Sequence, residues 1–208
     1  MAKVHPSATA SSRPSLPALP ASSAEAASLT VWRKSLVFHG DGFTVFDAKG
    51  NLAFRVENYP SASRAEIVLM DADGKPLLTI RRKKLSLGDH WLIYDGEAAT
   101  NPQFAVKKHV NLIGSRSLVH VTACCPGAAK SCLSYEVEGS YSRRCCTVYD
   151  HRRRQLAQIM RKEASPGVAL GADVFRLIVE PGLDAAFAMA VVILLDQMFE
   201  SRGSILRV

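Results

Sequence analysis

Basic side chains occur in short runs along this chain, and their type and spacing suggest chemistry. Arginine and lysine both donate hydrogen bonds to phosphate oxygens, arginine as a planar fork and lysine as a compact charge. Because alternate side chains of a strand point to opposite faces, about half of each run must be exposed to solvent. We therefore take these basic residues as candidates for binding an anionic ligand. They are Arg81, Arg82, Lys83, Lys84, Lys107, Lys108, Arg152, Arg153 and Arg154.

The same runs have a second interpretation, in which a solvated charged face only keeps strands from aggregating and binds nothing. The formal net charge of +7 favours acidic partners, which are an anionic membrane surface such as one containing phosphoinositides, an acidic protein or nucleic acid. Aromatic residues make up only 7% of the chain and are not interleaved with the basic runs. That weakens the case for a groove that binds single-stranded nucleic acid, because such a groove needs stacking platforms.

Cysteine and histidine, the other reactive side chains, do not form a recognisable site. The cysteines are Cys124, Cys125, Cys132, Cys145 and Cys146. None is in a C-x-x-C pair, and vicinal cysteines on a strand point to opposite faces, so we expect free thiols rather than a zinc site. The histidines are scattered singly, and the chain contains no H-E-x-x-H, Walker or G-x-S-x-G motif. We expect no metal, no cofactor and no enzymatic activity.

The length of 208 residues suits one domain with a sizeable core. Residues 1–28 are rich in Ser, Ala and Pro and predict a disordered tail, with an organellar transit peptide as the alternative. Only Lys3 and Arg13 are basic there, which counts against the transit peptide. Residues 29–208 are predicted to form the folded domain. An odd number of cysteines without a secretory signal favours an intracellular location, in the cytoplasm, at a membrane surface or in the nucleus.

From Leu29 onward, short apolar runs alternate with turn signals. Asp47, Asp71 and Asp95 each follow an aromatic residue or a methionine and lie 24 residues apart, and Asp150 follows Tyr149 in the same way. Aspartate ends strands by accepting hydrogen bonds from the turn backbone. We therefore interpret these aspartates as turn residues at separate hairpin tips, and not as catalytic carboxylates.

This pattern predicts about a dozen short strands and no long amphipathic helix between them, which favours a sandwich or a barrel. The expected strand centres lie near Trp32, Val45, Phe54, Val68, Thr79, Leu92, Ala105, Val119, Tyr135, Val148, Ile159 and Phe175.

Near the C-terminus, residues 183–199 predict one helix, with Pro181 at its first position and Asp184 in its first turn. Between Asp184 and Asp196 the uninterrupted apolar stretch is far shorter than the roughly 20 residues that a bilayer requires, so no transmembrane span is expected. A helix that is apolar on all sides must be buried on all sides. A barrel of about twelve strands leaves a lumen that such a helix can fill. Residues 204–208 are expected to form a last strand that closes the barrel.

Four ordered segments carry a resemblance to a known family. They are "LTVWRKSLVFHGDGFTVFDAKGNLAFRVENY", "IVLMDADGKPLLTIRRKKLSLGDHWLIYDGE", "CCTVYDHRRRQLAQIMRK" and "DVFRLIVEPGLDAAFAMAVVILLDQMF". Together they cover most of residues 29–199, and the chain resembles the plant LURP-one-related family, whose domain is similar to the tubby C-terminal domain and to phospholipid scramblases.

The resemblance implies a mainly β protein, a closed antiparallel barrel of twelve strands around a central hydrophobic C-terminal α-helix. It also implies a non-enzymatic module that binds phosphoinositides or a protein partner, as a membrane-tethered regulator in plant defence. Two alternatives follow from the same relatives: a scramblase-like lipid translocator and a nucleic-acid-binding transcriptional regulator.

Overall fold

The computed structural model describes residues 25–36, 41–58, 66–83, 89–97, 100–109, 116–124, 133–165, 168–169 and 171–200. The predicted tail up to residue 24 lies outside the described residues, as do Lys84, Cys125 and Cys132.

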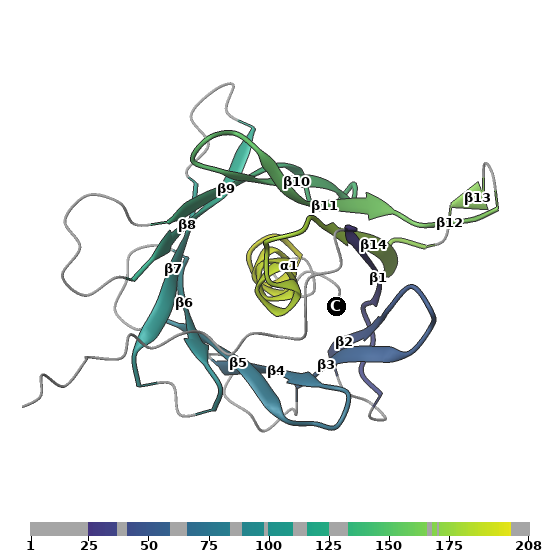
Figure 1. Cartoon of the computed structure of the whole chain (residues 1–208), viewed down its shortest axis with the longest axis horizontal. Coiled ribbons are helices and arrows are strands. Elements are labelled where there is room, and N and C mark those ends of the chain that lie inside the picture. Colours follow the sequence, from purple (N-terminus) through teal and green to yellow (C-terminus); the bar gives the residue numbers. More distant parts are fainter. Residues whose placement is uncertain are drawn as a thin grey trace, which may run out of the picture.

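Twelve antiparallel strands form a closed barrel around a single helix (Figure 1). In chain order the barrel strands are β1 (Ala27–Trp32), β2 (Asp41–Phe46), β3 (Leu52–Asn58), β4 (Glu66–Asp71), β5 (Pro76–Arg82), β6 (His90–Asp95), β7 (Pro102–Lys108), β8 (Ser117–Ala123), β9 (Ser134–Ser140), β10 (Cys145–Asp150), β11 (Gln155–Arg161) and β14 (Val174–Val179). Each strand centre expected from the sequence lies inside one of these strands, so the predicted barrel is confirmed. A two-stranded sheet that the sequence did not predict, β12 (Glu163–Ser165) with β13 (Val168–Ala169), stands outside the ring (Figure 1).

The barrel closes through β14, which pairs with β11 on one side and with β1 on the other. In the β1–β14 pair, Ala27 lies opposite Val179 and Trp32 opposite Val174. The predicted closing strand, residues 204–208, lies outside the described residues, and the ring is already complete before the helix begins.

The helix α1 spans Ala185–Phe199 and begins later than the sequence suggested. Pro181 lies in a turn ahead of it, and Asp184 is the N-cap residue rather than a residue of the first turn. The Asp184 carboxylate accepts a hydrogen bond of 2.7 Å from the backbone N–H of Phe187, which satisfies one of the donors that a helix start leaves open.

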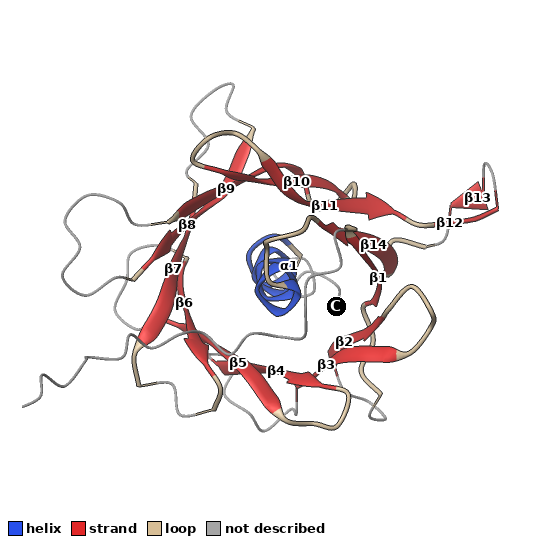
Figure 2. Cartoon of the chain, in the orientation of Figure 1, coloured by secondary structure: helices blue, strands red, loops and turns tan. Residues whose placement is uncertain are grey.

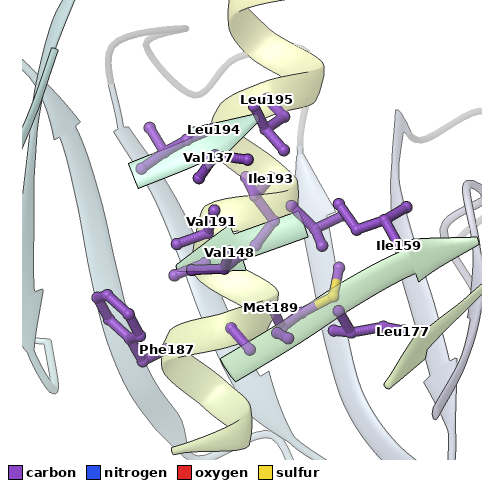
Figure 3. Close-up of a cluster of buried hydrophobic side chains, with 14 of the residues drawn as sticks. Val137, Val148, Ile159, Leu177, Phe187, Met189, Val191, Ile193, Leu194 and Leu195 are labelled. Carbon is purple, nitrogen blue, oxygen red and sulfur yellow. The ribbon is translucent and has the colours of Figure 1, made fainter. Parts of the chain in front are cut away.

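The helix α1 lies inside the barrel, where Figure 2 shows it in blue within the ring of red strands. Residues 186–196 and Met198 are all buried. Alternate strand residues point inward to meet them, and Met189 lies close to Ile159 and Leu177 (Figure 3). Near the start of the helix, Phe187 packs against Phe104 and Tyr135, with ring centroids 4.5 Å and 5.2 Å away. The prediction that the apolar helix is enclosed is therefore confirmed.

The up-and-down topology explains the repeat of aspartates. Since neighbouring barrel strands are antiparallel, two strands and their turns return the chain to the same end of the barrel. Asp47, Asp71, Asp95 and Asp150 consequently all lie at one end, which we call the aspartate end. The helix starts at this end, after β14, and runs to the opposite end of the barrel.

Candidate anion-binding surface

The end of the barrel opposite the aspartate end is rich in cations, and we call it the basic end. It is formed by the last residues of β1, β5, β7 and β11, by the turn after β9 and by the start of β8. The basic residues there are Arg33, Lys34, Arg82, Lys83, Lys107, Lys108, Arg116, Arg143, Arg144, Arg161 and Lys162. The helix C-terminus points to the same end, and its unpaired carbonyls favour nearby positive charge.

Several of the predicted ligand-binding residues already have partners. Arg81 Nε lies 2.6 Å from Glu66 Oε2, and Arg82 Nη2 lies 2.9 Å from Asp89 Oδ1. Such exposed pairs contribute little stability, but they neutralise the cation.

Lys108 serves the helix rather than the surface. Its ammonium donates a 2.9 Å hydrogen bond to the carbonyl of Met198 and lies 4.2 Å from the ring centroid of Phe199. Both contacts hold the last turn of α1 against β7.

Lys83 and Lys107 differ from these residues. Both side chains are exposed, and among the described residues no carboxylate lies within ion-pair distance of either. They stand at the ends of β5 and β7, on either side of β6, whose His90 lies opposite Lys107. On the other side of Lys107 the cross-strand neighbour is His120. The structure thus brings these two predicted lysines together on one side of the basic end.

The structure does not bring Arg152, Arg153 and Arg154 to the same place, because the turn after β10 lies at the aspartate end. Arg154 Nε is 2.8 Å from Asp150 Oδ2.

Arg153 adopts a φ of +63° and stacks over Tyr149, at 4.4 Å from its ring centroid. Its guanidinium forms ion pairs with Glu136 and Glu138 at 3.1 Å and 2.8 Å. Hydrogen bonds from Arg153 hold the pKa of Glu138 below its ordinary value. All three arginines of this run are exposed, and only Arg152 has no side-chain ion pair among the described residues.

A partly buried ionic cluster surrounds the end of the helix at the basic end, and sequence reasoning missed it. Arg33, which follows β1, forms ion pairs with Asp196 at 3.1 Å, with Asp173 at 3.6 Å and, at short range, with Glu200. The Tyr141 hydroxyl lies 3.4 Å from Asp196 Oδ1. The one available signal was Asp196 itself, an acid inside an otherwise apolar stretch.

Arg144 forms the other half of this ionic cluster and is only 2% exposed. Its guanidinium lies 4.2 Å from the ring centroid of Tyr141 and 4.6 Å from that of Phe175. Arg144 Nε donates a 2.9 Å hydrogen bond to the carbonyl of Ala172. Arg144 Nη2 lies 2.9 Å from Glu200 Oε1, which makes an ion pair but not an aligned hydrogen bond. The cluster ties the helix end to three separate parts of the barrel.

Burial shifts the protonation equilibria of this cluster. It raises the pKa of Asp196 to about 6, although Arg33 works in the opposite direction. It also raises the pKa of Tyr141 well above its ordinary value, and the charge of Asp196 adds to that shift. For Arg33, burial alone would lower the pKa, but the carboxylates of Asp196 and Glu200 outweigh it and raise the pKa.

Two of the thiols lie next to each other at the start of β10. Cys145 is exposed and Cys146 is buried, as expected for vicinal residues on a strand. Burial raises the pKa of Cys146 to about 12, which keeps it a thiol at neutral pH. Within the described ranges, no group of three or more His, Cys, Asp or Glu side chains is arranged to hold a metal ion. The same ranges contain no helix with both the length and the apolar character to cross a membrane.

Comparisons with known proteins agree with this architecture. Residues 27–196 match the model of a family described as LURP-one-related. Protein LURP-one-related 8 of Arabidopsis thaliana is 50% identical over 205 residues, which cover 97% of this chain and 100% of that protein. Protein LURP-one-related 5 of the same plant is 47% identical over 182 residues, with 84% of each chain covered. The X-ray structure of a further Arabidopsis thaliana protein superposes with a TM-score of 0.62 at 26% identity, covering 85% of this chain and 93% of that one.

Proposed function

The chain belongs to the LURP-one-related family, and from this premise we propose that it is a non-enzymatic module whose basic end binds anionic phospholipid headgroups at a membrane surface. The observation that carries the proposal is the unequal distribution of charge between the two ends. Lys83 and Lys107 lack carboxylate partners in the described residues and lie on either side of His90. At the aspartate end, in contrast, Arg153 and Arg154 are paired with Glu136, Glu138 and Asp150. Each basic residue near an anionic leaflet contributes about 1 kcal/mol, so a few unpaired cations give reversible attachment.

The buried helix supports peripheral attachment rather than insertion. Leaving the barrel would expose the apolar helix, empty the lumen and break the contacts of Arg33, Arg144 and Lys108 with the helix end. A scramblase-like translocator that uses this helix in the bilayer would have to meet all of these costs. We therefore place that alternative behind attachment through the surface.

An acidic protein would be attracted by the same cations, and so would nucleic acid. Membrane binding is favoured because Lys83 and Lys107 are both exposed and lie on either side of His90, so that one anionic surface can contact them together. In this proposal, membrane attachment tethers a regulator, and its process is plant defence, as the family resemblance suggests.

Flotation with lipid vesicles tests the proposal. The probe is phosphatidylcholine vesicles with and without phosphatidylserine or phosphatidylinositol bisphosphate, at low and at physiological salt. The variant K83E/K107E reverses two cations of the basic end, and K49E/K75E makes the same charge change in two exposed turns of the aspartate end. We expect K83E/K107E to weaken binding at least tenfold and the control variant to change it much less.

Three results would overturn the proposal. They are no binding to any anionic vesicle at low salt, equal losses for the two variants, and a tighter, salt-dependent complex with DNA than with vesicles.

A further inference from the structure

A groove of about 460 Å³ lies on the outside of the barrel, across β1, β2 and β14, and none of the predicted ligand-binding residues lines it. It is lined by Ser28 and Thr30 of β1 and by the β2–β3 turn around Asp47, which forms the end that we call the far end. Lys162 and Arg176 also line it. Thr30 has Arg176 as its cross-strand neighbour on β14 and Phe46 on β2, so one row of outward side chains crosses the groove.

The two cations of the groove lie next to Thr30, and one of them contacts its hydroxyl group. Lys162 Nζ donates a 2.7 Å hydrogen bond to Thr30 Oγ1, and Arg176 is exposed beside the same threonine. In the described residues, neither cation lies within ion-pair distance of a carboxylate. Like charges placed side by side are unfavourable unless an anion joins them.

The one carboxylate of the groove is already engaged in its own turn. Asp47 Oδ1 accepts 2.8 Å hydrogen bonds from the backbone N–H groups of Lys49 and Asn51, and Oδ2 accepts from the Asn51 side chain at 3.0 Å. The hydrogen bonds from Asn51 hold the pKa of Asp47 below its ordinary value, so it stays charged at the far end and leaves the cationic end to the ligand.

Exposed apolar side chains flank the cations. Trp32 follows Thr30 on the outward face of β1 and is 39% exposed, and Met160 lies opposite Arg176 on β11 and is 37% exposed. Lys34 lies 5.5 Å from the ring centroid of Trp32. An exposed tryptophan beside lysine and arginine is the combination that settles at the boundary between headgroups and acyl chains.

We propose that this groove is a specific site for the phosphate of one phospholipid headgroup, held by Lys162, Arg176 and the Thr30 hydroxyl, with Trp32 and Met160 dipping into the lipid surface. The inference rests on the proposed membrane attachment. It adds the class of lipid that is bound and the side of the barrel that faces the membrane. A lysine and an arginine on one phosphate favour a headgroup that ends in a phosphate monoester, which carries more charge and more free oxygens than a diester. A free phosphate compound would gain nothing from Trp32 and Met160, and this favours the lipid as the source.

The experiment compares vesicles of phosphatidylcholine with phosphatidic acid and vesicles of phosphatidylcholine with phosphatidylserine, adjusted to equal surface charge. We expect the natural chain to bind the phosphatidic acid vesicles at least fivefold more tightly. K162Q/R176Q should lose this preference and retain the salt-dependent binding to phosphatidylserine. The control K75Q/R152Q removes the same charge at the aspartate end, at residues that do not line the groove, and should keep the preference.

Tryptophan fluorescence gives an independent readout, because the chain has two tryptophans and Trp91 is buried. In the W91F background, emission from Trp32 should shift to the blue on phosphatidic acid vesicles.

Each outcome separates this inference from the proposed function. Equal binding of both vesicle types, with loss only in K83E/K107E and no change in Trp32 emission, would overturn the groove and leave attachment by the basic end intact. In a second outcome, excess glycerol phosphate abolishes the preference for phosphatidic acid while Trp32 emission stays unshifted. That result would assign the groove to a soluble phosphate and would also overturn the lipid site. Absence of binding to every anionic vesicle would remove the proposed function itself.

Discussion

The two ends of the barrel share one topology but differ in chemistry. At the aspartate end, three of the four turn aspartates act locally, because Asp47, Asp71 and Asp150 accept hydrogen bonds from the backbone of their own turns. At the basic end, acids and bases far apart in sequence meet around the helix C-terminus, as Arg33 and Glu200 do. Charged residues at the aspartate end therefore stabilise turns. Charged residues at the basic end hold the C-terminus of the helix, and some of the cations there are left for a partner.

The helix runs between the two ends, so a charge placed in its middle should lower the stability of the domain more than a change at either end. Leu194 is fully buried, and L194D would place a carboxylate there without a partner. We expect loss of several kcal/mol, enough to unfold the domain rather than to alter its location. Chemical denaturation followed by circular dichroism measures this, and A188D should behave alike. Q197D, at a partly exposed position of the same helix, is the control. A folded L194D protein of near-native stability would contradict the enclosed helix.

The fold could be predicted from the sequence because its signals are local. Period-two apolar runs and aspartate turns gave the barrel strands, and a helix apolar on all sides had to lie inside them. The N-cap role of Asp184 and the small β12–β13 sheet were missed, since element boundaries and strands of two or three residues leave little pattern.

The candidate site was only partly predictable because topology, not spacing, assembles it. A run of basic residues shows where cations are, but not whether a carboxylate faces them. Arg153 and Glu138 are paired across two strands, and Arg33 meets Asp196 from the other end of the chain. The groove likewise joins Thr30 to Lys162, which are separated by 132 residues.

The ionic cluster of the basic end should make stability depend on pH through Asp196. Its pKa is about 6 in the fold against an ordinary 3.8, so folding favours the protonated form. The resulting stabilisation is fully present below pH 3.8 and is lost as the pH rises through about 6. The difference between a pKa of 3.8 and one of about 6 corresponds to about 3 kcal/mol. The groups that face Asp196 are Arg33, Tyr141, Arg144 and Glu200.

Urea denaturation of the natural chain and of D196N, at several pH values, isolates this contribution. Since the asparagine does not titrate, D196N should gain stability relative to the natural chain by about 3 kcal/mol between pH 4 and pH 7. A difference that stays flat over this range would show that Asp196 is ionised in the fold as readily as in water.

At the aspartate end, the turn aspartates should differ in how much they contribute to thermal stability. Asp150 accepts backbone hydrogen bonds from Arg152 and Arg154 and also contacts the Arg154 side chain. D150A should therefore lower Tm by a few degrees, and D47A should act similarly through the turn at Lys49. Calorimetry measures both. D71A, which loses a single backbone hydrogen bond, should lower Tm less, and an equal fall in all three would argue against this local hydrogen-bond role.

The smallest expected effect separates two adjacent lysines of the basic end. Lys108 donates to the Met198 carbonyl at the helix C-terminus, whereas Lys107 points outward without a carboxylate partner in the described residues. K108M keeps an unbranched apolar side chain but loses the ammonium, with its charge and its hydrogen bond to Met198, so it should cost about 0.5–1 kcal/mol of stability and leave vesicle binding nearly unchanged. K107M should do the reverse, with unchanged stability and weaker binding to phosphatidylserine vesicles. If K108M weakened vesicle binding as much as K107M, the basic end could not be divided into cations that hold the helix and cations that face the membrane.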